Sequence, residues 1–218
     1  MIAVLFDLDG TLLDLPVAIE PVRVRVGEIL AARGWTGPLR PILGAIDRAV
    51  AEVARDADDA AALRRQARAV IDAAEVDAAV RATPRPGARQ AVERAAAGGH
   101  PTGICTSNGR ACVAPALAAA GLPVEGWTAI VTRDDVDRAK PDPDGVVRAA
   151  RALLPEGGAL YWVGDSPLDV GAGRAAHGIL AGMTLRIVAV TGGRGTEADL
   201  RSAGADQLIA DLSRLELA

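Results

Sequence analysis

Short apolar runs alternate with helical stretches from about residue 86 to the end of the chain, and this alternation leaves few folds open. The runs, with a first one at residues 2–6, occupy residues 101–106, 128–132, 159–163, 185–190 and 207–210. Apolar residues recur at helical spacing in the segments between them, residues 88–97, 111–120, 143–153, 169–176 and 197–203. Because crossover helices between parallel strands cover both faces of a sheet, the pattern predicts a three-layer, doubly wound α/β fold with a parallel sheet.

Residues 15–85 interrupt this alternation, and we call them the insert. They contain no β-rich run, and their apolar residues follow helical spacing. The spacing predicts helices over residues 17–33, 41–55 and 60–81. We therefore expect an α/β core domain of residues 1–14 and 86–218, with a helical domain of residues 15–85 inserted after the first strand.

Composition argues against several classes of protein. The net charge is −4, with no basic block and few aromatic residues, so nucleic acid is not an expected partner. No apolar stretch reaches the length of about 18 residues that a membrane span needs. The first apolar run lacks the basic region of a signal peptide, and Cys105 and Cys112 are expected to be reduced. We expect a cytoplasmic protein, and the sequence leaves its oligomeric state open.

Two carboxylates follow the first apolar run. Asp7 and Asp9 are two residues apart, so on an extended chain their side chains point the same way. Gly10 permits the turn that ends the strand. Two like charges at one strand exit are costly unless a cation or a reaction needs them, although an Asp-Gly-Thr segment is also ordinary turn chemistry.

Lys140 is the only lysine among the 24 Lys and Arg residues of the chain. An ammonium is a compact point charge, whereas a guanidinium is a planar fork, so the two are not equivalent. Chance could place a single lysine anywhere. Its position in the segment 138–143, which also holds two prolines, favours a site that needs an ammonium.

Four short segments carry polar or charged side chains that could bind a ligand or take part in catalysis. Each segment follows a different strand or its loop. They are residues 7–11, 105–109, 140–141 and 163–169. Ligands of parallel α/β sheets bind beyond the carboxyl ends of the strands, so these segments are expected to form one site.

The order and content of these segments resemble the haloacid dehalogenase-like hydrolase superfamily. Within it, the Lys-Pro-Asp-Pro segment and the residues 203–206 before the last strand are similar to phosphoglycolate phosphatase-like members. The insert corresponds to the family's helical cap of the C1 type. The resemblance implies a Rossmann-like core with a cap and a small phosphorylated substrate.

An aspartyl-phosphate mechanism follows from the resemblance. Asp7 would be the nucleophile, and Asp9 would protonate the leaving group and then deprotonate the attacking water. Thr106 and Lys140 would bind oxygens of the phosphoryl group and balance its charge.

Mg²⁺ is the cofactor that the resemblance implies, because it prefers hard oxygen ligands. The carboxylates of Asp7 and Asp165 and the backbone carbonyl of Asp9 would hold it. Asp169 would support the metal or its bound waters. A connection at residues 177–182 is longer than is usual in the family, and whether it displaces Asp169 is left open.

Simpler interpretations exist for several of these residues. Asp165 could cap a helix, Asp169 could be an ordinary acid in a first helical turn, and Thr106 could be a strand-end hydroxyl. Ser107 and Asn108 lie at the same rim, where they could bind substrate or merely begin a helix.

Two arginines and one glycine-rich segment also allow two interpretations. Arg23 and Arg25, in the first helix of the insert, could bind an anionic part of the substrate or could be solvated. Residues 192–195 look like a phosphate loop but lack the Lys-Ser/Thr ending of a P-loop, so we interpret them as a turn.

The residues of the insert and the presence of Asp9 restrict which of the family's activities we expect. The insert contains no lysine, so the Schiff-base chemistry of phosphonatases lacks its nucleophile, and Asp9 favours phosphoryl transfer over dehalogenation. We expect a Mg²⁺-dependent phosphatase of a small phosphorylated metabolite. A pyrophosphatase, a phosphotransferase or mutase, and an inactive relative that binds a partner are the alternatives.

Overall fold

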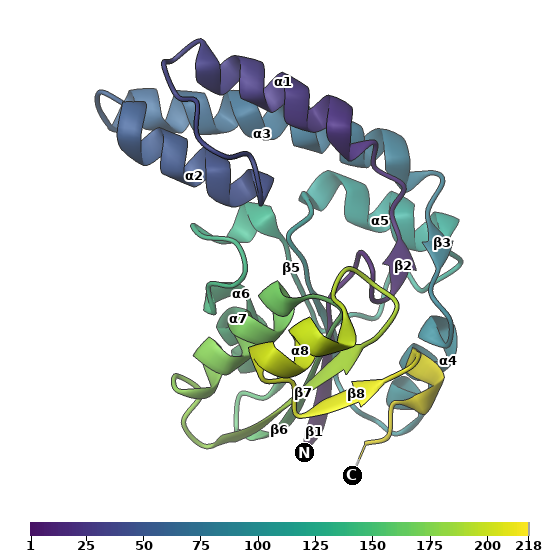
Figure 1. Ribbon diagram of the computed structural model, residues 1–218. Helices are drawn as coiled ribbons and strands as arrows, with labels where there is room; N and C mark the ends of the chain where they lie inside the picture. The colour runs from purple at the N-terminus through teal and green to yellow at the C-terminus, as the bar shows by residue number, and fades with distance from the viewer. Residues whose placement is uncertain (218) are drawn as a thin grey trace.

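A six-stranded parallel sheet forms the centre of the computed structural model, which describes residues 1–217 (Figure 1). The strand order is β5-β4-β1-β6-β7-β8, so the first strand of the sequence lies inside the sheet. The strands are β1 (Ile2–Phe6), β4 (Thr102–Cys105), β5 (Ala129–Val131), β6 (Gly158–Gly164), β7 (Met183–Val190) and β8 (Gln207–Ile209). The predicted α/β class and parallel sheet are confirmed.

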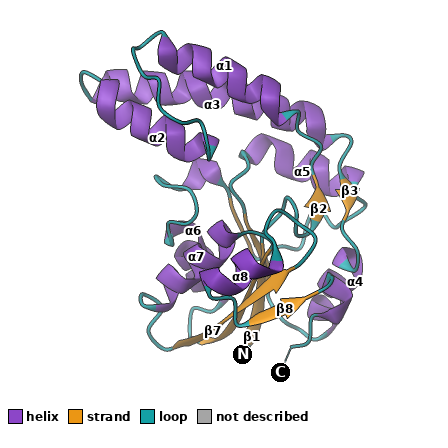
Figure 2. Ribbon diagram, viewed as in Figure 1, coloured by secondary structure: helices purple, strands orange, loops and turns teal. Residues whose placement is uncertain are grey.

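Helices cover both faces of this sheet (Figure 2). Val4 and Phe6 of β1 pack in one apolar cluster with α4 (Ala88–Ala97) and α5 (Arg110–Ala119). The alternate residues Ala3 and Leu5 pack in a second cluster, because successive side chains of a strand face opposite sides. The helices of this second cluster are α6 (Asp144–Leu153), α7 (Pro167–His177) and α8 (Glu197–Ala203).

Three helices of the insert form a separate apolar cluster (Figure 1). They are α1 (Ile19–Ala31), α2 (Ile42–Val53) and α3 (Ala57–Ala79). Val22, Val26 and Leu30 of α1 lie at helical spacing and pack against α2 and α3. The predicted helices are therefore present, with ends that differ by a few residues.

The chain enters and leaves the insert side by side. β2 (Leu13–Asp14) pairs antiparallel with β3 (Thr83–Pro84), and the sequence pattern predicted neither of these two-residue strands. The end of α3 is built into the core, since Ala78, Ala79 and Ala82 belong to the apolar cluster that contains α5. The division into domains at residues 15 and 85 stays a prediction.

Smaller features complete the fold. Two 3₁₀ helices, η1 (Arg133–Asp135) and η2 (Leu212–Arg214), lie in connecting segments.

Cys105 and Cys112 are free, as predicted, and burial raises the pKa of both thiols to about 12. Among residues 1–217, no helix has the length and apolar character needed to cross a membrane.

Candidate active site

Asp7 lies at the carboxyl end of β1, at the centre of the sheet. Its backbone N–H donates to the carbonyl oxygen of Val163 in β6, at 2.8 Å, so the ends of the two strands are level. Gly10 follows with a φ of +98°, and a Cβ atom there would collide with the carboxylate of Asp165. A glycine is therefore required where the chain turns beside this carboxylate.

Asp165 and Asp169 reach the same point from β6 and α7. Asp165 directly follows β6, and Asp169 lies in the first turn of α7. Ser166 caps this helix, and Asp169 Oδ2 accepts from its backbone N–H at 3.0 Å. Asp169 is thus a capping acid, as the simpler interpretation had it, but its other oxygen faces the site.

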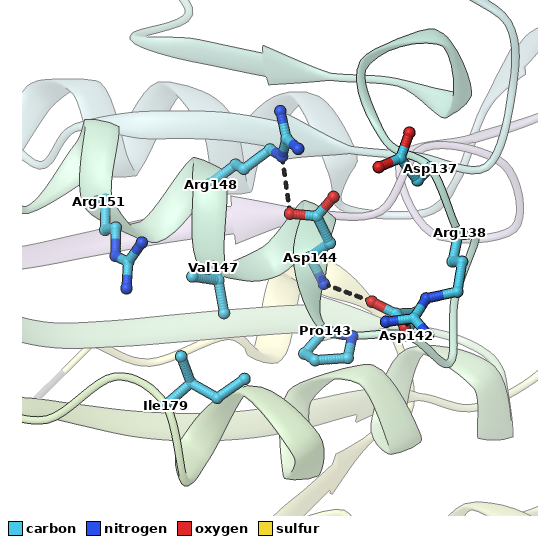
Figure 3. Close-up of a pocket in the computed structure, with 9 residues that line it drawn as sticks. All are labelled: Asp137, Arg138, Asp142, Pro143, Asp144, Val147, Arg148, Arg151 and Ile179. Atoms are coloured by element: carbon cyan, nitrogen blue, oxygen red, sulfur yellow. Dashed lines mark hydrogen bonds and ion pairs between the residues drawn. The ribbon is translucent and has the colours of Figure 1, made fainter.

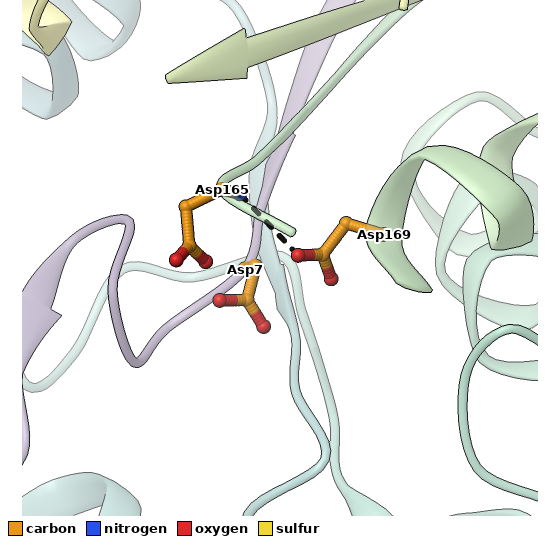
Figure 4. Close-up of side chains that lie close together, drawn as sticks. All are labelled: Asp7, Asp165 and Asp169. Carbon is orange, nitrogen blue, oxygen red and sulfur yellow. Dashed lines mark hydrogen bonds between the residues drawn. The ribbon is translucent and has the colours of Figure 1, made fainter. Parts of the chain in front are cut away.

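Three buried carboxylates therefore meet, and we call Asp7, Asp165 and Asp169 the acid cluster. One carboxylate oxygen from each residue lies within 4.8 Å of the other two, and Figure 4 shows the three side chains turned toward a common space. Burial, opposed by Lys140 and reinforced by the two neighbouring acids, raises the pKa of Asp7 to about 7. Burial and Asp169 also raise the pKa of Asp165.

Lys140 lies against this cluster, although the loop that carries it is distant in sequence. Its Nζ lies 2.5 Å from Asp7 Oδ1, 2.5 Å from Asp169 Oδ1 and 3.3 Å from the carbonyl oxygen of Cys105. Burial opposes its charge, but Asp169 and Asp7 outweigh that cost and raise the pKa of the ammonium. The indole of Trp162, 5.1 Å from Nζ, covers it from β6.

The donor set of the acid cluster fits a hard divalent cation. Three carboxylates face one ammonium, which leaves two negative charges unbalanced when all are ionised. Carboxylate oxygens are the ligands that Mg²⁺ and Ca²⁺ prefer, and buried like charges are costly without such a partner.

Asp9 is buried beside the cluster but has partners of its own. Its Oδ1 accepts from the backbone N–H of Leu15 at 2.9 Å, and its Oδ2 pairs with the guanidinium of Arg194. Burial raises the pKa of Asp9, while Arg194 and the Leu15 N–H oppose the rise.

Arg194 is a residue that the sequence interpretation missed. Residues 192–195 do form a turn, as predicted, yet the Arg194 N–H also donates to Asp165 Oδ2 at 2.7 Å. A Cβ at Gly193 would collide with the same carboxylate. The available signal was the position of this glycine-rich turn after β7, another carboxyl end of the sheet.

Thr106, Ser107 and Asn108 follow β4, next to β1. Ser107 and Asn108 line the cavity that contains the acid cluster. Thr106 is buried, and it is not among the described residues that line that cavity. Its hydroxyl donates to Asn108 Oδ1 at 2.8 Å and accepts from the Asn108 N–H at 3.1 Å.

A second buried group of charges joins this loop to the insert. Glu75 of α3 pairs with Arg133 of η1, and Arg133 also pairs with Asp72. Glu75 accepts from the side chain of Asn108 and from the N–H of Gly109. We call these five residues the Glu75 clasp. Sequence reasoning missed it, although a glutamate on the buried stripe of α3 was a signal.

A cavity of about 980 Å³ lies between the core and the insert. The acid cluster, Asp9, Lys140 and Arg194 line its core side. Its insert side combines apolar residues and arginines with the acids Asp47 and Glu75, and its other lining residues include Val17, Ile19, Arg23, Arg40, Ile42 and Ile71.

The two arginines of α1 that were considered for substrate binding differ. Arg23 lines this cavity, whereas Arg25 pairs with Glu28 on the exposed surface of the insert. Of the two, only Arg23 is placed to contact a molecule in the cavity, and its guanidinium also pairs with Glu20.

Another depression, of about 630 Å³, lies beside α6 and the loop before it (Figure 3). Four of its charged residues form pairs: Arg148 donates to Asp144 at 2.7 Å, and Arg138 pairs with Asp142. None of the predicted site residues lines it, so the cavity above the acid cluster is the candidate site.

The connection at residues 177–182 leaves Asp169 in the cluster. It begins at the last residue of α7, whereas Asp169 lies in the first turn of that helix. The additional residues are therefore accommodated at the opposite end of α7 from the acid cluster.

Comparisons with known proteins agree with this geometry. A family model of haloacid dehalogenase-like hydrolases matches residues 1–177. No curated protein matches the chain. Solved structures match over nearly the whole length. A haloacid dehalogenase-like hydrolase from Bacteroides fragilis has a TM-score of 0.69 and 23% identity, with 98% of this chain and 99% of that chain covered.

Two further similar structures are of a protein in complex with phosphate and of a predicted phosphatase. CbbY from Rhodobacter sphaeroides in complex with phosphate has a TM-score of 0.62 and 24% identity, covering 98% of this chain and 95% of that chain. A predicted phosphoglycolate phosphatase from Haemophilus somnus has a TM-score of 0.61 and 19% identity, with 97% and 94% covered. The family match extends over most of the sequence, and the chain belongs to the haloacid dehalogenase-like hydrolases.

Proposed function

We propose that this hydrolase is a Mg²⁺-dependent phosphatase that acts on a small phosphorylated metabolite. One observation carries the proposal: a buried, charge-unbalanced acid cluster with a single ammonium opens into a cavity of about 980 Å³. Two of the similar structures, CbbY with phosphate and the phosphoglycolate phosphatase, also favour phosphate chemistry.

Mg²⁺ would be held by the carboxylates of Asp7 and Asp165 and by the backbone carbonyl of Asp9, with Asp169 supporting it. When bound, the ion would neutralise the charge of the carboxylate and phosphoryl oxygens that must approach each other. The role of Asp169 is consistent with its position, since the helix cap holds one oxygen and the other faces Lys140.

Asp7 is the nucleophile in this proposal. One of its oxygens forms a bond to phosphorus while the bond from phosphorus to the leaving oxygen breaks. Lys140 orients the Asp7 carboxylate and neutralises charge on the phosphoryl oxygens. The arrangement of Lys140 between Asp7 and Asp169 supports this role, because the ammonium is buried and fully charged there.

Asp9 moves the protons. In the first step its carboxylic acid gives a proton to the leaving oxygen, and in the second its carboxylate takes a proton from the attacking water. The oxygen of that water forms a bond to phosphorus while the bond between phosphorus and Asp7 breaks. This step releases inorganic phosphate and restores the Asp7 carboxylate. The N–H of Leu15 orients Asp9 at the start of the insert, and Arg194 must move from Asp9 before the acid can carry a proton.

The insert acts as a cap in this proposal, with the core made of residues 1–14 and 86–218 and the cap of residues 15–85. It covers the cavity and excludes water from the aspartyl-phosphate. Arg23 and the apolar residues of the insert would contact the part of the substrate that is not phosphate. Ser107 and Asn108 would bind phosphoryl oxygens from the core side, with Thr106 behind them.

A panel of phosphorylated metabolites tests this proposal, with phosphate release measured in Mg²⁺ and again in chelator. We expect hydrolysis of at least one ester, loss of activity in chelator and recovery on Mg²⁺ addition. Product analysis with competing acceptor alcohols separates a phosphatase from a phosphotransferase or mutase, and pyrophosphate in the panel tests the pyrophosphatase alternative. Mg²⁺ binding without turnover of any compound would favour an inactive binding relative.

A further inference from the structure

Glu75 is an acid on the buried side of a helix. It is 5% exposed, and its neighbours on that side of α3 include Ile71, Ala78 and Ala79. Its partner Arg133, from η1 of the core, is 1% exposed, and Arg133 Nη2 lies 2.8 Å from Glu75 Oε2. Burying an ion pair costs desolvation that a well-packed apolar pair avoids, so the pair is weak evidence for stability alone.

Attachment of the insert does not explain the pair. The end of α3 is already fixed to the core through Ala78, Ala79 and Ala82 in the apolar cluster with α5. The β2–β3 ladder joins the two parts at a second place.

The contacts of the pair converge on one loop instead. Three successive residues after β4 are held: Arg133 Nη1 donates to the Ser107 carbonyl oxygen at 2.5 Å. The Asn108 side-chain amide donates to Glu75 Oε1 at 3.0 Å, and the Gly109 N–H donates to Glu75 Oε2 at 2.8 Å. The backbone of this loop is thus fixed by groups outside it.

Glu75 also decides which way the Asn108 amide points. Because a carboxylate only accepts hydrogen bonds, the Asn108 nitrogen must face Glu75 and its oxygen must face away. That oxygen accepts from the Thr106 hydroxyl at 2.8 Å. A glutamate of the insert therefore orients, through Asn108, the hydroxyl that follows β4.

The same loop borders the acid cluster. Ser107 and Asn108 line the cavity together with Asp7 and Lys140, and β4 is the neighbour of β1 in the sheet. Any phosphate held at the Asp7 carboxylate lies beside this loop. A change in the loop backbone would alter the donors that a phosphoryl group meets.

We propose that Glu75 is a positioning residue for phosphate: paired with Arg133, it holds residues 106–109 in the conformation that receives the phosphoryl oxygens. An insert residue thereby sets the phosphate affinity of the core. The inference rests on the proposed function, since it takes phosphate as the group bound at Asp7.

Inorganic phosphate in the presence of Mg²⁺ is the probe, measured by calorimetry and as an inhibitor of ester hydrolysis. Glu75→Gln keeps the shape but turns a donor toward Asn108 or Gly109. We expect phosphate binding about tenfold weaker, from the loss of one hydrogen bond and the misorientation of the loop, with KM raised more than kcat is lowered. Asp59→Asn is the matched control, because Asp59 pairs with Arg33 inside the insert.

Glu75→Asp is the second variant, because it keeps the charge opposite Arg133 and withdraws from the loop. It is expected to weaken phosphate binding as well, and it replaces Glu75→Gln if that variant does not fold. Unchanged phosphate affinity in the folded variant, or an equal loss in Asp59→Asn, would overturn the inference.

The wild-type protein separates this inference from the proposed function. Phosphate binding that depends on Glu75, without hydrolysis of any ester, would reject the phosphatase and leave the positioning role standing. A wild-type protein that does not bind phosphate in Mg²⁺ would reject both.

Discussion

Two buried groups of charges differ in their balance. The acid cluster places three carboxylates against the single ammonium of Lys140. In the Glu75 clasp, one buried carboxylate meets one buried guanidinium, and the second acid, Asp72, is 44% exposed to solvent. The buried part of the clasp is neutral, whereas the acid cluster carries an excess of negative charge.

The pKa values follow this difference. In the acid cluster, burial and the neighbouring acids raise the pKa of Asp7 to about 7 against the opposing charge of Lys140, so this carboxylate holds a proton more tightly than a free aspartate does. In the clasp, burial opposes the charge of Arg133, but Glu75 and Asp72 outweigh that cost and raise the pKa of the guanidinium, which stays charged. Burial therefore does not distinguish the proposed active site from the clasp, whereas unbalanced charge does.

If the two groups differ in this way, removing a charge from the acid cluster should mainly lower turnover, and removing one from the clasp should lower stability and phosphate affinity. Asp7→Asn should lower turnover of any ester substrate by at least about a thousandfold, because the nucleophile is lost. Unfolding by heat should be unchanged or shifted upward, since a buried charge is removed.

Asp14→Asn is the matched control for this variant, because Asp14 is exposed in β2 and, within residues 1–217, forms an ion pair only with Arg85. It should retain wild-type turnover. Activity above a few per cent in Asp7→Asn would reject Asp7 as the nucleophile.

Lys140 offers a second comparison within the acid cluster. Lys140→Met keeps an unbranched side chain one atom shorter than lysine and removes the charge, so turnover should fall about a hundredfold as phosphoryl charge is left unbalanced. Lys140→Arg should recover only part of this loss, because a planar fork does not reach several oxygens as a point charge does. Full recovery with arginine would show that charge alone matters there.

Removing one partner of the buried ion pair in the clasp should lower the free energy of unfolding. Arg133→Met leaves Glu75 buried without a counter-charge, and we expect unfolding free energy to fall by about 3 kcal/mol in urea titrations. Arg33→Met, which breaks an ion pair within the insert, should cost much less. Adding Glu75→Leu to Arg133→Met should restore stability without restoring phosphate affinity. Similar losses in the two single variants would remove the contrast between the pairs.

The smallest effect concerns the metal-free protein and pH. Folding raises the pKa of Asp7 from 3.8 to about 7, so the folded state holds this proton more tightly than the unfolded state. This stabilisation is present at low pH and is lost as pH rises through about 7. In chelator, the unfolding temperature should fall by about 5 °C between about pH 5 and pH 8.

Two comparisons check the origin of this slope in thermal-shift measurements. Asp7→Asn should flatten it because the titrating group is absent, and Mg²⁺ should flatten it because the ion stabilises the ionised cluster. A wild-type slope retained in Asp7→Asn would assign the effect to other groups.

Much of the fold could be predicted because hydrophobic periodicity marks helices and buried strands locally. The strand at residues 2–6 and the helices at 88–97 and 197–203 were predicted with their observed ends. β2 and β3 were not, because two-residue strands carry no period. The expected cytoplasmic location stays a prediction.

The acids of the site could be placed together because parallel strands end at one edge of a sheet. The roles of Arg194 and the Glu75 clasp were missed. The insert holds many arginines and acids at helical spacing, and only tertiary packing selects Glu75 to face the core, 58 residues from its partner Arg133. The same packing turns Arg23 into the cavity and leaves Arg25 in solvent.

Calorimetric titration of the metal-free protein with Mg²⁺ tests whether the unbalanced acids form a cation site. The account predicts one Mg²⁺ per chain for the wild type and no binding to Asp165→Asn, with Asp14→Asn binding as the wild type does. A wild type that takes up no Mg²⁺, or an Asp165→Asn variant that binds it equally well, would contradict the account.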